Sequence, residues 1–313
     1  GNSAALTSLT VGSTNGTAIN GGSVTTTGSQ TFSNAVTLGN DTTLSGSGIT
    51  LGNTVNGATA NSVGLTITDS GVTTITGAIG NTAALTSLTV GSTNGTAING
   101  GSVTTTGSQT FSNAVTLGNN TTLTGSGITL GNAVNGATAN SVSLTIADSG
   151  ATTITGAIGN SAALTSLTVG STNGTAINGG SVTTTGSQTF SNAVTLGNNT
   201  TLTGSGITLG NAVNGATANS VSLTIADSGA TTITGAIGNS AALTSLTVGS
   251  TNGTAINGGS VTTTGSQTFS NAVTLGNDTT LSGSGITLGN TVNGATANSV
   301  GLTITDSGVT TIT

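Results

Sequence analysis

The sequence predicts an all-β fold, a parallel β-solenoid, and three observations lead to this prediction. One long phrase occurs four times, beginning at residues 1, 80, 159 and 238, so that its period is 79. Short apolar segments alternate with Thr, Ser or Gly, which is typical of strands with one buried face. Gly, Asn-Gly and Ser-Gly separate these segments and are typical of corners. Self-similarity over such a long period indicates stacked units rather than one globular core.

The four copies cover residues 1–79, 80–158, 159–237 and 238–313, and the last copy stops three residues short. We expect them to form one continuous rod. Copies one and four share one sequence type, and copies two and three share another. The two types differ by exchanges between small residues: Asp41/Asn120, Ser45/Thr124, Thr54/Ala133, Gly64/Ser143, Thr68/Ala147 and Val72/Ala151.

A shorter period lies within each copy, where an Asn is followed four residues later by an aliphatic residue. The steps from one such Asn to the next are 18, 20, 21 and 20, and together they make one copy. The spacing predicts about 20 residues per turn, within the range of periods that solenoids use. It also predicts four turns per copy and about 16 turns in the chain. Three apolar clusters per turn predict a coil with three sides.

Within the first copy, the predicted strands are three to five residues long. The clearest examples are Leu9–Val11, Val36–Leu38, Ile49–Leu51 and Leu65–Ile67. Their β-branched and aliphatic residues suit a pleated, half-buried surface. Equivalent strands in neighbouring turns would pair at a spacing of about 4.8 Å.

The predicted core is a narrow column of Val, Ile, Leu and Ala. It takes one aromatic residue per copy, at Phe32, Phe111, Phe190 and Phe269. A thin core has little room for aromatic rings, which accounts for their scarcity.

The recurring Asn residues are candidate structural sites. We predict a ladder in which stacked side-chain amides hydrogen-bond from turn to turn. An alternative is that each Asn occupies a corner that needs a left-handed φ. The candidates in the first period are Asn20, Asn40, Asn61 and Asn81.

Composition excludes most kinds of chemistry. The chain has no Lys, Arg, His, Glu or Cys, and its only ionisable side chains are Asp41, Asp69, Asp148, Asp227, Asp278 and Asp306. Acid–base and nucleophilic catalysis need a base that is missing here, and zinc binding needs Cys or His, which are missing too. Nucleic-acid binding needs cations on the phosphates. We therefore expect no enzyme, no cofactor, no metal and no nucleic acid, and we interpret the Asp residues as solvated turn residues rather than calcium ligands.

Two further expectations concern partners. No apolar run is long enough to span a bilayer, so we expect no membrane insertion by this segment. The ends of a rod would present unpaired strand edges, and a net charge of −6 offers little repulsion. We therefore expect self-association into fibres or bundles.

Three repeated phrases resemble those of a known protein family: "TTTGSQTFSNAVTLGNDTTLSGSGITLG", "LTITDSGVTTITGAIG" and "ALTSLTV". The chain resembles, over its whole length, the β-strand repeats of filamentous-haemagglutinin-like and autotransporter-like large secreted bacterial adhesins. The resemblance implies a right-handed β-helix at the bacterial cell surface, outside the cell. It also implies a role in adhesion, biofilm or surface fibres.

Together these observations predict the structural shaft of an extracellular bacterial surface fibre or giant adhesin, which acts as a repetitive spacer and assembles into filaments. Contact with a glycan or host surface would then lie elsewhere in the full protein. The alternative is an adhesive binding module whose repeated face binds a glycan, a host surface or sister fibres.

Overall fold

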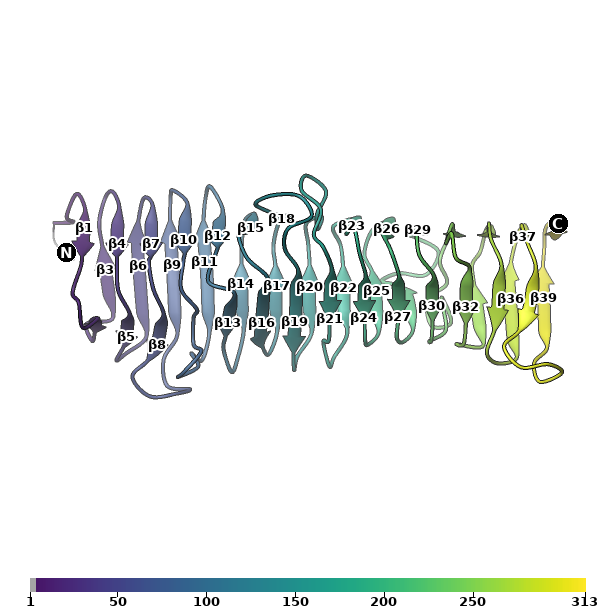
Figure 1. The fold of residues 1–313 in the computed structure, drawn as a ribbon, viewed down its shortest axis with the longest axis horizontal. Helices are drawn as coiled ribbons and strands as arrows, with labels where there is room; N and C mark the ends of the chain where they lie inside the picture. The colour runs from purple at the N-terminus through teal and green to yellow at the C-terminus, as the bar shows by residue number, and fades with distance from the viewer. Residues whose placement is uncertain (1–3) are drawn as a thin grey trace. The chain divides into compact units, whose positions relative to one another are not determined.

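The computed structural model describes residues 4–313, and all regular secondary structure within them is β-strand (Figure 1). The predicted fold class is confirmed, because parallel strands about 21 residues apart stack into a β-solenoid. The chain forms two compact units, residues 1–156 and 157–313. No helix in the described part of the chain has the length and apolar character of a membrane span.

The strands of unit 1 are short, as the alternation predicts. The first copy contains β1 (Leu9–Val11), β2 (Thr17–Ile19), β3 (Ser23–Thr25), β4 (Gln30–Phe32), β5 (Val36–Leu38), β6 (Thr42–Gly46), β7 (Ile49–Leu51), β8 (Val55–Gly57), β9 (Leu65–Asp69) and β10 (Thr73–Ile75). The second contains β11 (Leu88–Ser92), β12 (Thr96–Ile98), β13 (Ser102–Thr104), β14 (Gln109–Phe111), β15 (Val115–Leu117), β16 (Thr121–Gly125), β17 (Ile128–Leu130), β18 (Val134–Gly136), β19 (Leu144–Asp148) and β20 (Thr152–Ile154).

Unit 2 repeats this series. The third copy contains β21 (Leu167–Val169), β22 (Thr175–Ile177), β23 (Ser181–Thr183), β24 (Gln188–Phe190), β25 (Val194–Leu196), β26 (Thr200–Gly204), β27 (Ile207–Leu209), β28 (Val213–Gly215), β29 (Leu223–Asp227) and β30 (Thr231–Ile233). The fourth contains β31 (Leu246–Val248), β32 (Thr254–Ile256), β33 (Ser260–Thr262), β34 (Gln267–Phe269), β35 (Val273–Leu275), β36 (Thr279–Gly283), β37 (Ile286–Leu288), β38 (Val292–Gly294), β39 (Leu302–Asp306) and β40 (Thr311–Ile312).

Unit 1 has three sides of parallel strands. One side runs β1-β4-β7-β10-β12-β15-β18, and another runs β3-β6-β9-β11-β14-β17-β20. The third holds β2-β5-β8 and β13-β16-β19, which are joined by Ile79, because this residue bridges Val55 and Val103. The three-sided coil follows from this arrangement.

Unit 2 has the same plan. Its sides are β21-β24-β27-β30-β32-β35-β38 and β23-β26-β29-β31-β34-β37-β40, and a third side holds β22-β25-β28 and β33-β36-β39. Ile237 joins the two parts of the third side by bridging Val213 and Val261. The two units therefore have equivalent strand order.

The number of turns per copy differs from the prediction of four. Along one side of unit 1, the residues in register are Thr10, Thr31, Thr50, Thr74 and Ala97. Four turns thus run from Thr10 to Ala97. One copy is shorter than four turns, because the residue equivalent to Thr10 in the second copy is Thr89, which comes before Ala97. Thr89 lies in β11, on a different side.

Each copy therefore contains eleven sides rather than twelve. The ten strands β1 to β10 supply ten of them, and the bridge at Ile79 supplies the eleventh. Because three sides make a turn, one copy winds three and two-thirds turns. In each unit the second copy is displaced by one side from the first, and the chain has about 14 turns rather than 16.

The physical reason is that one step between recurring Asn residues is less than a full turn. Only two strands, β11 and β12, lie between Asn81 and Asn99, whereas each of the other steps spans three sides. Asn20, Asn40 and Asn61 all lie in the corner that precedes the side containing β9, and at Asn61 this corner is extended by an exposed loop, residues 58–62, that leaves the coil. A turn without this loop is short, as from β4 to β7, where Gln30 is in register with Ile49. A turn that carries the loop is longer, as from β6 to β9, where Thr42 is in register with Leu65. The turns are therefore unequal in length, and the step of 18 residues, which the spacing counts as a turn, spans only two sides.

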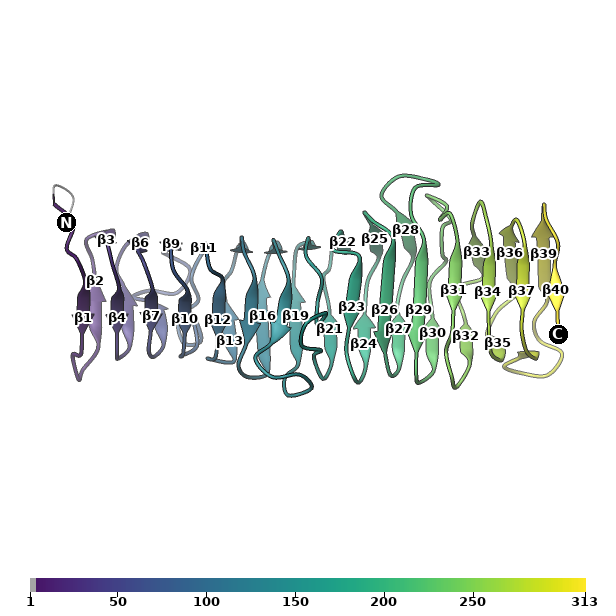
Figure 2. The ribbon, with the colours of Figure 1, turned by 90° about the horizontal axis from the view of Figure 1, so that it is seen from above.

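The projecting loops make the displacement visible. In Figure 1 the loop after β8 and the loop after β18, which have the same sequence, leave unit 1 at opposite edges of the view. In Figure 2 the loop after β28 and the loop before β39 do the same in unit 2. Identical surface features of neighbouring copies within a unit therefore face different directions.

The core lies along the axis of each unit and follows from alternation along the strands. In β9, Leu65 and Ile67 are each 1% exposed, while Thr66 and Thr68 between and beside them face solvent. Burying each aliphatic side chain stabilises the fold by about 1.5–3 kcal/mol. Inward apolar positions therefore stabilise the coil, and outward hydroxyls face solvent.

Corners depend on residues that accept a left-handed backbone. Gly16 has φ +89°, and a Cβ there would lie 2.9 Å from the carbonyl oxygen of Ala35 in the next turn. Only glycine combines this φ with such a close approach at low cost. Gly16 thus allows the corner between β1 and β2 to pack directly on the turn above.

Candidate functional site

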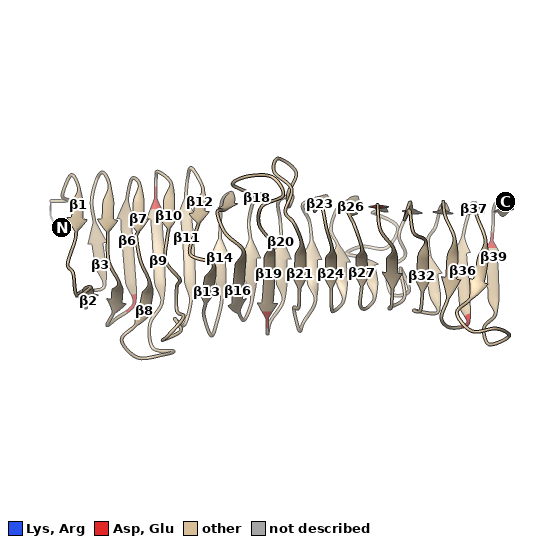
Figure 3. Cartoon of the chain, in the orientation of Figure 1, with Lys and Arg blue, Asp and Glu red and all other residues tan. Residues whose placement is uncertain are grey.

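Aspartates are the only ionisable side chains, so any charged site must be built from them (Figure 3). They fall into two groups. Asp41 and Asp278 stand before β6 and β36, while four others end β9, β19, β29 and β39. Among the described residues, no three such groups lie close enough to hold a metal ion.

Asp69 forms the centre of a buried polar corner. Its side chain is 1% exposed. Oδ1 accepts the N–H groups of Gly48 and Gly71 at 2.7 and 2.8 Å, and Oδ2 accepts the N–H of Ile49 and the hydroxyl of Thr73, both at 2.9 Å. The carboxylate therefore accepts three backbone N–H groups and one hydroxyl from two adjacent turns.

The corner extends into a third turn. Ser92 donates its hydroxyl to Oγ1 of Thr73 at 2.6 Å, and both residues are fully buried. One chain of hydrogen bonds thus runs from Gly48 through Asp69 and Thr73 to Ser92. Hydrogen bonds to a charged group contribute more than neutral ones, so this arrangement strengthens the connection between consecutive turns at the corner.

The same corner recurs in the other copies. Asp148 and Asp227 are each 1% exposed and accept equivalent sets of four donors at 2.7–2.9 Å. The interpretation of the aspartates as solvated turn residues is therefore wrong for Asp69, Asp148 and Asp227. Their position two residues after an inward Ile points them into the coil, where the neighbouring turn supplies the donors.

Asp306 occupies the equivalent corner in the last turn of unit 2. The N–H of Gly285 is the largest of several hydrogen bonds that lower its pKa from 3.8 to about 2. Gly308, Thr310 and Ile286 donate the others. The donors stabilise the charged carboxylate relative to the protonated acid.

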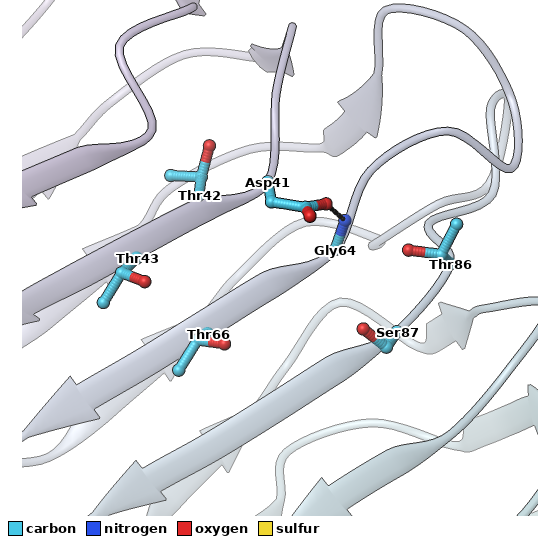
Figure 4. Close-up of a pocket in the computed structure, with 7 residues that line it drawn as sticks. All are labelled: Asp41, Thr42, Thr43, Gly64, Thr66, Thr86 and Ser87. Carbon is cyan, nitrogen blue, oxygen red and sulfur yellow. Dashed lines mark hydrogen bonds between the residues drawn. The ribbon is translucent and has the colours of Figure 1, made fainter.

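Asp41 builds a different corner, at the surface. Its Oδ1 accepts the N–H of Gly64 at 2.8 Å (Figure 4). The shallow hollow beside it has a volume of about 220 Å³, below the roughly 300–1,000 Å³ of typical small-molecule sites. Seven residues line it: Asp41, Thr42, Thr43, Gly64, Thr66, Thr86 and Ser87.

The second copy shows that this corner does not need the charge. There Asn120 replaces Asp41, and its Oδ1 accepts the N–H of Ser143 at 2.9 Å. The change from Gly64 to Ser143 accompanies it, and a Cβ on Gly64 would lie 2.7 Å from Oγ of Ser87. Two of the exchanges between sequence types are therefore neighbours in space. The shared feature of this corner is one hydrogen bond, and the carboxylate is not common to all copies.

The four candidate Asn residues do not stack as amides. Asn40 donates to the backbone carbonyl of Asn20 at 2.7 Å, so this contact joins a side chain to the backbone. Asn61 has φ +61°, as the corner alternative proposed, and Asn81 is exposed. In the described part of the chain, no amide-to-amide hydrogen bond links Asn20, Asn40, Asn61 and Asn81, although all four lie in the corner that precedes the side containing β9.

The phenylalanines lie in the interior. Phe32 is 1% exposed, and Phe111, Phe190 and Phe269 are fully buried. In register, Phe32 stands between Val11 and Leu51 of the neighbouring turns. The rings therefore pack along the coil and offer no surface for a ligand.

A buried glutamine is the feature that the sequence reasoning missed. Gln30 is fully buried, and its Nε2 donates to the carbonyls of Val24 and Ser45 at 3.1 and 2.7 Å. Its Oε1 has no partner among the described residues, and the same holds for Gln109, Gln188 and Gln267. The signal was available, because Gln30 stands two residues before the inward Phe32 on the same face of a strand.

Comparison with protein-family models, with curated proteins and with solved structures finds no match. The resemblance to large secreted bacterial adhesins therefore rests on the repeated phrases themselves. The chemistry of the two corners, which is hydrogen bonding between turns, is the firmest guide to function.

Proposed function

We propose that this chain is a structural spacer, the shaft of an extracellular bacterial surface fibre or giant adhesin. One observation carries the proposal: within each unit, the second copy is displaced by one side from the first. A repeated adhesive face would need the same residues on the same side in successive copies. A spacer needs only continuous stacking, which is independent of the side on which each residue lies.

The use of the polar side chains also supports a spacer. The carboxylates of Asp69, Asp148 and Asp227 and the amide of Gln109 are buried between turns. Aromatic residues, which commonly anchor protein partners, occur only as buried Phe. The side chains best suited to recognition are thus engaged in holding the coil together.

One observation favours the alternative, an adhesive module that binds a glycan, a host surface or sister fibres. Along the side of unit 1 that contains β9, an outward Ser or Thr occupies every turn. These residues are Ser23, Thr43, Thr66, Thr89, Thr110, Thr129 and Thr153. The row would present hydroxyls at intervals of about 4.8 Å, although different strands of the two copies build it.

Deleting one copy separates the two functions. Removal of residues 80–158 joins Ile79 to Gly159, which has the same following sequence as Gly80 except at Thr82. Three and two-thirds turns are lost, so a spacer shortens by about 18 Å. Fibre length by electron microscopy and surface attachment would be measured together, at equal surface display.

A spacer predicts shorter fibres with unchanged attachment. Attachment that falls in proportion to the number of copies contradicts the spacer and supports the adhesive module. The matched control removes residues 93–102, about half a turn, which shifts later strands onto the wrong sides. We expect this control variant not to fold. That result would show that deletion of a full copy is tolerated because every later strand still has an equivalent strand to pair with.

A further inference from the structure

The shallow hollow beside Asp41 lies where three successive turns of unit 1 meet at one corner. Asp41 precedes β6, and Gly64 precedes β9. Thr86 and Ser87 precede β11, and the three strands are neighbours on the same side. In Figure 4 the hydroxyls of Thr86 and Ser87 point toward Gly64, and the carboxylate of Asp41 points toward it from the opposite direction. Polar groups from three turns therefore face one another across Gly64.

Glycine at position 64 leaves the space that these groups surround. A Cβ on Gly64 would meet oxygen atoms of three side chains. It would lie 2.7 Å from Oγ of Ser87, 3.4 Å from Oγ1 of Thr86 and 3.7 Å from Oδ1 of Asp41. Three oxygen atoms therefore converge on the space that a side chain at position 64 would fill.

The polar groups around the hollow are available to a ligand. Thr42 donates its hydroxyl to the carbonyl of Asn40, and Oδ1 of Asp41 accepts the N–H of Gly64. Within residues 4–313, Oδ2 of Asp41 accepts no hydrogen bond from the protein. The same range offers no hydrogen-bond partner to the hydroxyls of four lining residues: Thr43, Thr66, Thr86 and Ser87.

The two sequence types differ mainly at this hollow. Four of the six exchanges between them lie on the outward face of β6 and β9 or in the corners just before these strands: Asp41, Ser45, Gly64 and Thr68. Copies with Asp at the first of these positions have Gly at the third. Copies with Asn there have Ser, as at Ser143, and the serine side chain takes the space beside the amide. The charge and the open space therefore occur together.

A primary ammonium group matches the chemistry of this hollow. It offers three N–H donors and no acceptor, whereas Asp41, Thr86 and Ser87 offer a carboxylate and two hydroxyl oxygens. Hydrogen bonds between an ammonium and a carboxylate are stronger than neutral ones. The chain has no Lys or Arg, so none of its own side chains supplies a cation to Asp41. The cation must therefore belong to a ligand.

The rest of the lining indicates what else the ligand contains. Thr43 and Thr66 add two hydroxyls, and no aromatic or aliphatic residue lines the hollow. A lysine side chain would place its methylene groups against this polar surface, whereas sugar hydroxyls would form hydrogen bonds with it. The volume of about 220 Å³ is enough for one sugar ring. We propose that the hollow binds an amino sugar unit with an unmodified amino group, whose ammonium contacts Asp41, Thr86 and Ser87.

This site goes beyond the proposed spacer function and does not depend on it. A shaft of any length can hold a sugar at one type of copy, so failure of the experiments below would leave the copy-deletion experiment unaffected. The site also differs from a repeated adhesive face, because Ser143 and Ser222 occupy the equivalent space in copies two and three. Exposed ion pairs contribute little to binding, so we expect a dissociation constant in the millimolar range.

The first test is saturation-transfer NMR, which follows the signals of a weakly bound ligand. The probe is glucosamine. Glucose lacks the ammonium, N-acetylglucosamine has it blocked, and Nα-acetyl-lysine amide has it without the sugar hydroxyls. We expect glucosamine to receive at least fivefold more transfer than each of these three compounds. Equal transfer to glucose would overturn the role of the charge, and equal or stronger transfer to the lysine derivative would overturn the assignment to an amino sugar.

Two double variants test the charge and the space separately. Asp41→Asn with Asp278→Asn removes the charge from both copies that have it and keeps the acceptors for Gly64 and Gly301. Gly64→Ser with Gly301→Ser keeps the charge and fills the space, as Ser143 does. We expect each variant to reduce transfer to glucosamine at least fivefold, with an unchanged circular dichroism spectrum. Full binding by either folded variant would overturn the proposal.

A gain of binding in the second copy completes the test. Asn120→Asp with Ser143→Gly rebuilds the hollow there, beside Thr165 and Ser166. We expect transfer to glucosamine to rise to nearly twice that of the unmodified chain. The matched control is Asn120→Asp alone, which adds the same charge while Ser143 still fills the space, and it should cause no rise. An equal rise in both variants would show attraction to charge alone, and no rise in either would show that the hollow is not the site.

Discussion

The two kinds of aspartate corner occur within one copy and differ in how their acceptors are used. Asp69 is buried and uses both oxygens for four donors. Asp41 is exposed and uses one oxygen for Gly64. The buried aspartate is present in all four copies, while the exposed one becomes Asn in two of them. An amide can replace a carboxylate where a single acceptor is needed, but not where both oxygens face donors.

The largest effect is expected for Asp69→Asn. The new NH₂ group would face N–H or O–H donors, which leaves buried donors without an acceptor. Loss of hydrogen bonds to a buried charged group costs about 1.5–3 kcal/mol, and we expect the free energy of unfolding to fall by about 3 kcal/mol. Denaturant unfolding followed by circular dichroism measures it.

Asp148→Asn serves as the repeat of this experiment in the second copy and should have the same effect. A change below about 1 kcal/mol in both variants would mean that the four hydrogen bonds contribute little, and the comparison between the corners would fail.

A smaller effect is expected for Thr73→Val, which keeps the shape of the side chain and removes its hydroxyl. The variant loses the donor to Asp69 and the acceptor for Ser92. We expect a loss of about 1–2 kcal/mol in the same unfolding measurement. Thr74→Val, at the outward neighbouring position in β10, is the control and should change stability little. Equal effects of the two variants would show that the hydroxyl of Thr73 is not specially important.

Asp306 provides a pH test of the same corner. Its pKa is depressed to about 2, so its contribution to stability is present above the ordinary value of 3.8 and is lost as the pH falls through about 2. We expect NMR signals of the Asp306 carboxyl and the Gly285 amide to titrate together with a midpoint near 2. A midpoint near 3.8 would show that the donors do not favour the charged form.

The smallest effect is expected for the surface corner. Asp41→Asn creates the residue type that copies two and three already contain and keeps the acceptor for Gly64. We expect the unfolding free energy to change by less than about 0.5 kcal/mol, as for most surface substitutions. The reverse variant, Asn120→Asp, should behave likewise. A loss comparable to that of Asp69→Asn would remove the distinction between the two corners.

Local patterns predicted the strands well because alternation is a property of adjacent residues. Segments such as Leu65–Ile67 place apolar residues inward whatever their partners are, and Phe32 lies in the interior as its place among aliphatic residues suggests. Gln30 also points inward, but because it is polar, the pattern of apolar residues did not predict its burial. Its burial depends on the carbonyls of Val24 and Ser45, which come from two different turns.

The sequence alone determined the all-β class, the copies, the short strands and the absence of bases, because each follows from composition or from neighbouring residues. Only the tertiary structure decided that a copy contains eleven sides, since only the pairing of strands shows that the 18-residue step between Asn81 and Asn99 spans two sides while the other steps span three. It also decided that Asp69 is buried, because the donors at Gly48 and Ile49 lie about one turn away. Contacts between turns, rather than local preference, determine which polar residues hold the solenoid together.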